Sequence, residues 1–153
     1  MIEFINEIKQ KAKRNPKRVI FPESALDEPR TLQAVRIIQE EKTAIPVLVG
    51  DQDKLGGFGM TVLDPSDSNL IDRYANILVE RRKNKGVTLE QARQLLKNPN
   101  YFGVTALLAG DVDGMISGSI GTTAETVKPA LEIIKTKEKF HKVSGFFFMV
   151  LEN

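Results

Sequence analysis

Short apolar runs rich in branched residues alternate with longer amphipathic stretches along this chain, and that alternation restricts its fold more than any other feature. Residues 18–21, 45–50 and 61–64 have the length and composition of buried strands. The stretches between them carry apolar residues at helical spacing. Because parallel strands need a crossover connection, this order predicts an α/β fold. We expect three layers, with a mostly parallel sheet in the middle and helices on both of its faces.

Capping residues and prolines mark where helices begin. Asp27 or Glu28 can cap a helix that holds Pro29 in its first turn. Thr88 and Gln91 have the spacing of a capping box, which predicts a helix over residues 88–97. Further helices are expected up to Asn15 and over residues 51–58, 69–82 and 101–110, and further strands over residues 114–118 and 143–151.

Composition narrows the class of protein. The 153 residues, of which 41% are hydrophobic, suit a single domain with a core of its own. The net charge is only +2 and acidic and basic residues are mixed, so neither a nucleic-acid partner nor a membrane partner is expected. The absence of cysteine excludes disulfides and thiolate chemistry and fits the reducing cytoplasm. His141 is the only histidine and is expected at the surface.

The stretch SGSIGTTAETVK follows an expected strand and precedes a helix, and it is the strongest candidate for a binding loop. Pliable backbone at Ser117 and Gly118, with free amides at the helix start, can surround an anion. The hydroxyls of Thr122 and Thr123 can add donors, and Lys128 can add a charge. The alternative is a capped helix after a tight turn, which needs no ligand.

Two other groups of polar residues also have two interpretations. Asp111 and Asp113 partly match a calcium-binding loop, but the remaining acidic positions are missing, which favours a simple turn. Glu23, Ser24 and Asp27 follow the first strand at the carboxyl edge of the sheet, where ligands usually bind. They are expected either to line a cleft or to cap a turn.

Longer motifs carry a family resemblance. In order along the chain, "RVIFPES", "RTLQAVRII", "PVLVG", "ERRKNKG", "NPNYFGVTALLAGDVDGMISGSIGTTAETVKPALEIIKT" and "FFFMVL" closely resemble the amino-terminal half of phosphate acetyltransferases, and the related phosphate butyryltransferases. The resemblance implies that residues 1–153 form the amino-terminal α/β domain of an acyltransferase. A fold like that of isocitrate and isopropylmalate dehydrogenases is implied, with a second domain and a carboxyl-terminal segment outside this chain. A homodimer is also implied.

The resemblance assigns roles to individual residues. Thr122 and Thr123 correspond to the Ser/Thr pair beside the phosphate or acetyl phosphate, and Ser117 and Gly118 belong to the same loop. Arg82 corresponds to an arginine that helps to hold coenzyme A, although a solvated helix end is the simpler interpretation from spacing alone. No cofactor is implied, because coenzyme A is a substrate.

Lys128 stands where relatives usually carry an arginine, so the charge is kept but the planar fork is lost. The implied reaction is exchange of an acetyl group between coenzyme A and inorganic phosphate. The family's proton acceptor and Ser-Arg pair lie outside these residues, so we expect little or no acetyl transfer by this chain alone. Two alternatives are a specialist for butyryl or longer acyl groups and a non-catalytic module that binds an anion or a partner.

Overall fold

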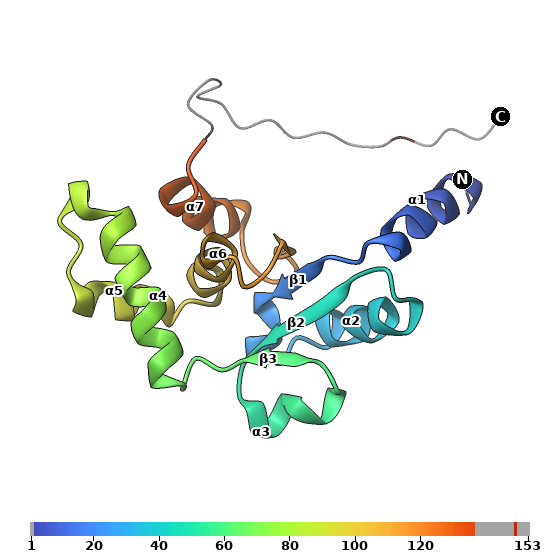
Figure 1. Cartoon of the computed structure of the whole chain (residues 1–153), viewed down its shortest axis with the longest axis horizontal. Coiled ribbons are helices and arrows are strands. Elements are labelled where there is room, and N and C mark those ends of the chain that lie inside the picture. Colours follow the sequence, from blue (N-terminus) through green and yellow to red (C-terminus); the bar gives the residue numbers. More distant parts are fainter. Residues whose placement is uncertain (1, 137–148, 150–153) are drawn as a thin grey trace.

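A four-stranded parallel sheet lies at the centre of the computed structural model, which describes residues 2–136 and 149 (Figure 1). Its strands are β1 (Arg18–Phe21), β2 (Ile45–Val49), β3 (Thr61–Leu63) and β4 (Gly114–Met115), in the order β3-β2-β1-β4. Every pairing is parallel. The three strands expected over residues 18–21, 45–50 and 61–64 are confirmed, each to within one residue.

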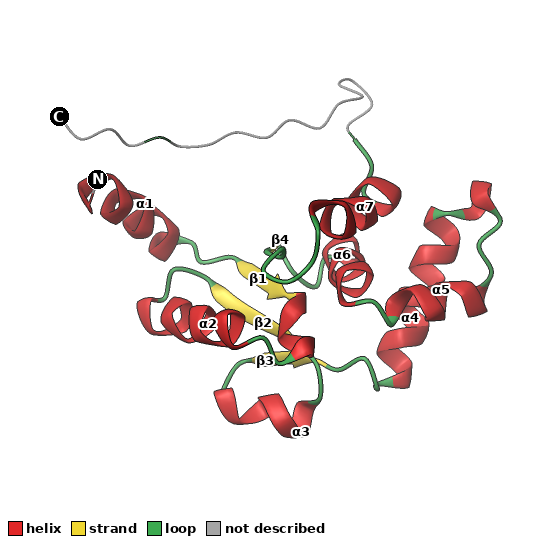
Figure 2. Cartoon of the chain, turned by 180° about the vertical axis from the view of Figure 1, so that it is seen from behind, coloured by secondary structure: helices red, strands yellow, loops and turns green. Residues whose placement is uncertain are grey.

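Helices connect these strands and follow them (Figure 2). They are α1 (Ile2–Arg14), α2 (Pro29–Glu41), α3 (Gln52–Leu55), α4 (Ser68–Arg81), α5 (Leu89–Leu96), α6 (Pro99–Ala109) and α7 (Thr123–Ile133), with short 3₁₀ helices η1 (Pro22–Leu26), η2 (Gly56–Phe58) and η3 (Lys83–Lys85). The side chain of Glu28 caps α2, and Thr88 and Gln91 form the expected capping box of α5. Within residues 2–136, no helix is long and apolar enough to cross a membrane.

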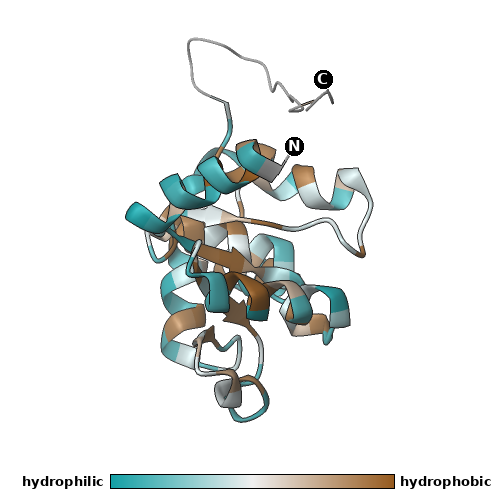
Figure 3. Cartoon of the chain, turned by 90° about the vertical axis from the view of Figure 1, so that its right-hand side faces the viewer, coloured by the Kyte–Doolittle hydropathy of each residue, from teal (hydrophilic) through white to brown (hydrophobic). Residues whose placement is uncertain are grey.

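Successive side chains of the strands point to opposite faces of the sheet and belong to two separate hydrophobic cores. Ile20, Val47 and Val49 point to one face and belong to a core that also holds side chains of α4, α5, α6 and α7, of which α6 contacts β4. Phe21 and Leu48 point to the opposite face and pack beneath α2 and α3. The strands form the apolar centre of the molecule (Figure 3). Helices on both faces of a parallel sheet confirm the three-layer α/β expectation, whereas the comparison with isocitrate and isopropylmalate dehydrogenases stays a prediction.

Two expected boundaries were wrong, and one expected element lies outside the described residues. The strand expected over residues 114–118 ends at Met115, because the chain then turns toward η1 through Gly118, whose φ is +117°. Helix α6 begins at Pro99 instead of residue 101, since the side chain of Asn98 accepts hydrogen bonds from the first amides of the helix. The strand expected over residues 143–151 falls outside the described residues except Met149, as does His141.

Asp111 and Asp113 form ion pairs that hold the turn before β4. Asp111 pairs with Arg73 and accepts a hydrogen bond from Tyr74 at 2.5 Å. Asp113 pairs with Arg18 at 2.9 Å, which fixes the start of β1 beside β4. In the described part of the chain, no group of three or more acidic or histidine side chains is placed to hold a metal ion.

Helix α6 approaches η1 and β4 very closely at Gly103. A Cβ atom added at this glycine would lie 2.6 Å from Cγ of Pro22 and 3.1 Å from Sδ of Met115. Both distances are below normal van der Waals contact, and the proline ring cannot rotate away. The glycine therefore allows α6 to pack directly on the segment that carries Glu23.

We expect the Gly103→Ala substitution to lower the free energy of unfolding by about 1–2 kcal/mol, because overpacking a tight core outweighs the better helix propensity of alanine. Urea denaturation measures the change. Gly57→Ala is the matched control, since no atom lies within 4 Å of the added Cβ. Equal stability of the Gly103→Ala variant and the unmodified chain would contradict the close approach.

Candidate functional site

The carboxyl ends of β1 and β4 meet at the point where the strand order reverses. The chain adds β2 and β3 on one side of β1 and then places β4 on the other side. In open α/β sheets, ligands usually bind outside the carboxyl ends of the strands at such a reversal. Glu23 follows β1 and the loop 116–122 follows β4, so the two segments meet at this position.

The backbone of the loop wraps around the carboxylate of Glu23. The amides of Gly118 and Ile120 donate to Oε1 at 3.0 and 3.2 Å. The amide and the hydroxyl of Ser119 donate to Oε2 at 3.0 and 2.6 Å. Glu23 is only 5% exposed. We call this arrangement of one carboxylate and four donors the Glu23 nest. The amides do surround an anion, but that anion is a side chain of the protein.

Hydrogen bonding keeps Glu23 ionised. Burial alone would raise the pKa of its carboxyl group, but the hydrogen bonds from Ser119, Ile120 and Gly118 outweigh burial and lower the pKa from 4.5 to about 2. Two side chains of α2 also contact Ser119. Arg30 donates a hydrogen bond to the carbonyl of Ser119 at 2.8 Å, and the Thr31 hydroxyl lies 3.3 Å from its Oγ. The nest is therefore a fixed, charged part of the fold.

The hydroxyl groups predicted for the phosphate site have partners within the protein or face solvent. Thr122 caps α7 in a full capping box, with hydrogen bonds to and from Glu125. The Ser117 hydroxyl donates to Oδ1 of Asn100 at 2.6 Å. Thr123 is exposed, and its hydroxyl makes no hydrogen bond to the residues that the structure describes. Whether Ser117, Thr122 and Thr123 contact phosphate stays a prediction.

A hollow of about 320 Å³ beside the nest is lined by two acidic side chains, Glu23 and Glu125. Asn98 and Asn100 complete its polar wall. Both glutamates have a lowered pKa, so both carry charge at neutral pH. An anion entering this hollow would meet carboxylates and would find the nest amides already bonded. Its chemistry therefore does not favour a phosphate group.

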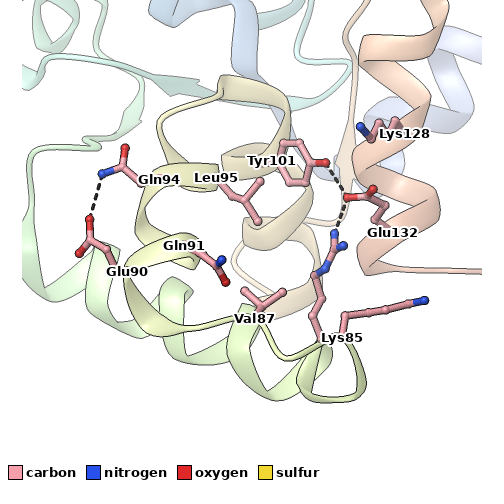
Figure 4. Close-up of a pocket in the computed structure, with 10 residues that line it drawn as sticks. Lys85, Val87, Glu90, Gln91, Gln94, Leu95, Tyr101, Lys128 and Glu132 are labelled. Atoms are coloured by element: carbon pink, nitrogen blue, oxygen red, sulfur yellow. Dashed lines mark hydrogen bonds and ion pairs between the residues drawn. The ribbon is translucent and has the colours of Figure 1, made fainter.

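A larger cavity, of about 590 Å³, brings together the two predicted cationic residues, Arg82 and Lys128. Arg82 directly follows α4 and Lys128 lies in α7; although these helices are far apart in sequence, both pack against α6 and bring the two side chains to one hollow. Lys85 is a third cation at its edge, and Val87 and Leu95 give it an apolar wall (Figure 4). We call this hollow the Arg82 cavity. Its size falls in the ordinary range for small-molecule sites.

Glu132 of α7 holds Arg82 in place. Its Oε2 pairs with Nη1 of Arg82 and accepts a hydrogen bond from the hydroxyl of Tyr101 at 2.5 Å. Glu132 faces Tyr101 across the gap between α7 and α6 (Figure 4). Nε of Arg82 is buried and has no hydrogen-bond partner among the described residues. An unpaired buried donor costs about 1–3 kcal/mol, so an acceptor such as a water molecule or a ligand would stabilise this nitrogen.

The electrostatics of this cluster follow from its contacts. Burial favours the neutral form of Glu132, but the hydrogen bonds from Tyr101 and Arg82 outweigh burial and lower its pKa. Burial and the hydrogen bond to Glu132 raise the pKa of Tyr101 to about 12. Arg82 and Glu132 therefore compensate each other, which leaves Lys85 and Lys128 as cations of the cavity without an ion pair among the described residues.

Lys128 precedes Pro129, whose place in the helix was open from the sequence. Pro129 is buried inside α7 and provides no amide donor for the carbonyl of Glu125. Nδ2 of Asn100 donates to that carbonyl at 3.4 Å instead, which joins α7 to the start of α6. The helix continues through Pro129, and Lys128 lies one turn before Glu132 on the side that lines the Arg82 cavity.

Sequence reasoning missed several residues of these clusters. Tyr101 and Glu132 carried no signal of a role, since Tyr101 belongs to a largely buried, apolar helix and Glu132 is an ordinary polar residue of α7. Of the three polar residues after β1, Glu23 forms the nest, whereas Ser24 is buried and bonds to Phe21 and Val49. Asp27, with φ of 52°, ends η1. The Thr-x-x-Glu spacing at residue 122 was the one available signal for the capping box.

Comparisons with known proteins identify the family. A family model described as "Phosphate acetyl/butaryl transferase" matches residues 3–153. The phosphate acetyltransferase of Thermoanaerobacterium thermosaccharolyticum is 40% identical over 159 residues, which cover 99% of this chain and 48% of that protein. That of Nitratidesulfovibrio vulgaris is 40% identical over 162 residues, which cover 100% of this chain and 22% of that protein.

A solved structure agrees with this assignment. The EutD phosphotransacetylase from Staphylococcus aureus superimposes with a TM-score of 0.84 at 34% identity, covering 99% of this chain and 48% of that one. The chain thus spans about half the length, or less, of each of these relatives. The family model and these relatives match nearly the whole sequence, so this chain belongs to the phosphate acetyl/butaryl transferase family.

Proposed function

We propose that this chain is the coenzyme-binding half of an acyltransferase that exchanges an acetyl group between coenzyme A and inorganic phosphate. Family membership supports the reaction class, since the relatives are named phosphate acetyltransferases. The observation that carries the proposal for this half is the Arg82 cavity, where a positioned arginine with an unpaired donor meets two lysines and an apolar wall. Phosphate groups beside an apolar chain are the chemistry of coenzyme A.

The proposed reaction needs charge stabilisation more than covalent help from the protein. The thiolate of coenzyme A attacks the carbonyl carbon of acetyl phosphate, a C–S bond forms, and the C–O bond to phosphate breaks as phosphate leaves. The thiol proton goes to a base that we place outside these 153 residues. Arg82, Lys85 and Lys128 would hold phosphate groups of the coenzyme or of acetyl phosphate.

The hydroxyl-bearing loop has a narrower role in this proposal than the sequence suggested. Ser117, Thr122 and Thr123 stay candidates for contacts with phosphate at the rim of the site. Gly118 serves the loop's geometry, because its φ of +117° turns its amide toward Glu23. We further expect a homodimer, from the family resemblance, and a location in the cytoplasm, from the absence of cysteine. Sedimentation equilibrium of the purified chain tests the first of these expectations.

Calorimetric titration with coenzyme A tests the proposal directly. We expect saturable binding by the 153-residue chain at one site and little or no acetyl-CoA formation when acetyl phosphate is added. Absence of binding would overturn the proposed function. Rapid turnover by the chain alone would overturn the placement of the base outside it. Saturable binding of acetyl phosphate with no affinity for coenzyme A would favour the alternative of a non-catalytic anion-binding module.

A further inference from the structure

We propose that Glu23 is a positioning residue whose carboxylate permanently occupies the loop's anion nest and thereby fixes the start of α7, the helix that brings Lys128 and Glu132 to the Arg82 cavity. The consequence for ligand binding rests on the proposed function, whereas the role in the nest does not. The nest is then an internal support for the site, and exogenous phosphate does not compete for it.

The occupancy of the nest carries the first step. Each oxygen of Glu23 accepts two hydrogen bonds, and all four donors come from three consecutive residues of the loop. A carboxylate is acceptor-only, so it matches four converging donors without leaving any of them unpaired. Hydrogen bonds to an ionised acceptor are about twice as strong as neutral ones. The near-complete burial of Glu23 means that little of the carboxylate faces solvent.

A short, continuous stretch of the chain, residues 120–132, connects the Glu23 nest to the Arg82 cavity. Ile120 ends the nest, Thr122 caps α7, and Lys128 and Glu132 lie on the following turns. Glu132 pairs with Arg82, so a shift of α7 would move both sides of the cavity wall at once. Asn100 ties the same loop and helix to α6 through Ser117 and the carbonyl of Glu125. Glu23 is the charged anchor of this path at the edge of the sheet.

Chemical rescue tests whether the nest needs a carboxylate. In the Glu23→Ala variant the nest loses its acceptor and gains a space similar in size to acetate. We expect its melting temperature to fall by about 10 °C, since a buried group with several charged hydrogen bonds is lost. Acetate should then restore at least half of that loss in a saturable manner. Sodium chloride at equal ionic strength should not, and acetate should leave the unmodified chain unchanged.

Two results would overturn the proposal: no loss of stability in Glu23→Ala, or the same response to acetate in the variant and the unmodified chain. Glu125→Gln is the matched control, because Glu125 contacts the same loop but is exposed, and glutamine keeps the capping box. If Glu23→Ala does not fold, Glu23→Gln replaces it. Amide hydrogens of residues 118–120 should then exchange at least about tenfold faster than in the unmodified chain, and unchanged exchange would overturn the proposal.

Coenzyme A affinity tests separately whether Glu23 positions the Arg82 cavity. Coenzyme A affinity of Glu23→Ala should fall by about tenfold or more and should recover with acetate, in parallel with the melting temperature. Loss of stability with full coenzyme A affinity would refute the positioning role while leaving the nest intact. If the unmodified chain does not bind coenzyme A, the proposed function fails, yet the rescue of stability by acetate still decides the role of Glu23 in the nest.

Discussion

Replacing Arg82 with glutamine is expected to weaken coenzyme A binding by roughly a hundredfold, because one or two charge-assisted hydrogen bonds to a phosphate group are lost. The substitution also removes the ion-pair partner of Glu132, which then keeps only the hydrogen bond from Tyr101. Arg82→Lys keeps the charge but loses the planar fork. Its affinity for coenzyme A should therefore lie between those of Arg82→Gln and the unmodified chain. Calorimetry gives the dissociation constants, and thermal unfolding shows whether each variant is folded.

Arg93→Gln is the control for this experiment. Arg93 pairs with Asp72 at 2.9 Å and is absent from the cavity wall. Its pair is well exposed, so its loss should change neither coenzyme A affinity nor stability by a measurable amount. Coenzyme A affinity that is equal in Arg82→Gln and in the unmodified chain would exclude the Arg82 cavity as the binding site.

The second large effect is on stability against acid. The pKa of Glu23 is about 2 in the folded protein against an ordinary value of 4.5. A carboxyl group whose pKa is lowered by folding stabilises the protein fully above its unfolded pKa and loses that effect as the pH falls toward its folded pKa. The stability difference between the unmodified chain and Glu23→Gln should therefore shrink by about 2 kcal/mol as the pH falls from 6 to 3.

This pH dependence separates the charge of Glu23 from its shape. Glutamine is as large as glutamate, but it sets an NH₂ group against donors of the nest at every pH. The charged neighbours Glu28 and Arg30 are present in both proteins, and the charge of Glu23 is only the last of the causes that shift the pKa of each. Urea denaturation at successive pH values gives both free energies. A difference that stays constant between pH 6 and pH 3 would show that packing, and not the carboxylate's charge, explains the effect.

Local signals in the sequence were enough to predict most of the elements. The strand over residues 18–21 and the capped starts at Glu28 and Thr88 were confirmed, because each depends on neighbouring residues alone. The strand predicted over residues 114–118 was too long, since the chain leaves the sheet after Met115 and wraps around Glu23, a residue 95 positions away from Gly118. A contact at that separation depends on β4 lying beside β1, and strand order is not encoded in local spacing.

The candidate site, too, depends on contacts between residues far apart in sequence, which local patterns do not predict. Backbone amides around an anion were expected from glycine, serine and threonine, and the loop does form such an arrangement. The sequence could not tell that the anion is Glu23, because a nest accommodates any carboxylate or phosphate of suitable position. Lys128 was named from its place after the loop and Arg82 from the resemblance, but their meeting in one cavity depends on how α4 and α7 pack on α6. The contacts of Tyr101 and Glu132 with the cavity can be recognised only once these helices are packed together.

Amide chemical shifts during titration with coenzyme A test the central claim most directly, since they report on the nest and on the Arg82 cavity in the same sample. The account predicts saturable shifts at Arg82, Lys85, Tyr101 and Lys128, with the amides of residues 118–120 unchanged because Glu23 already binds them. Large shifts confined to residues 118–120, with none around the cavity, would show that the ligand displaces Glu23 and would contradict the account.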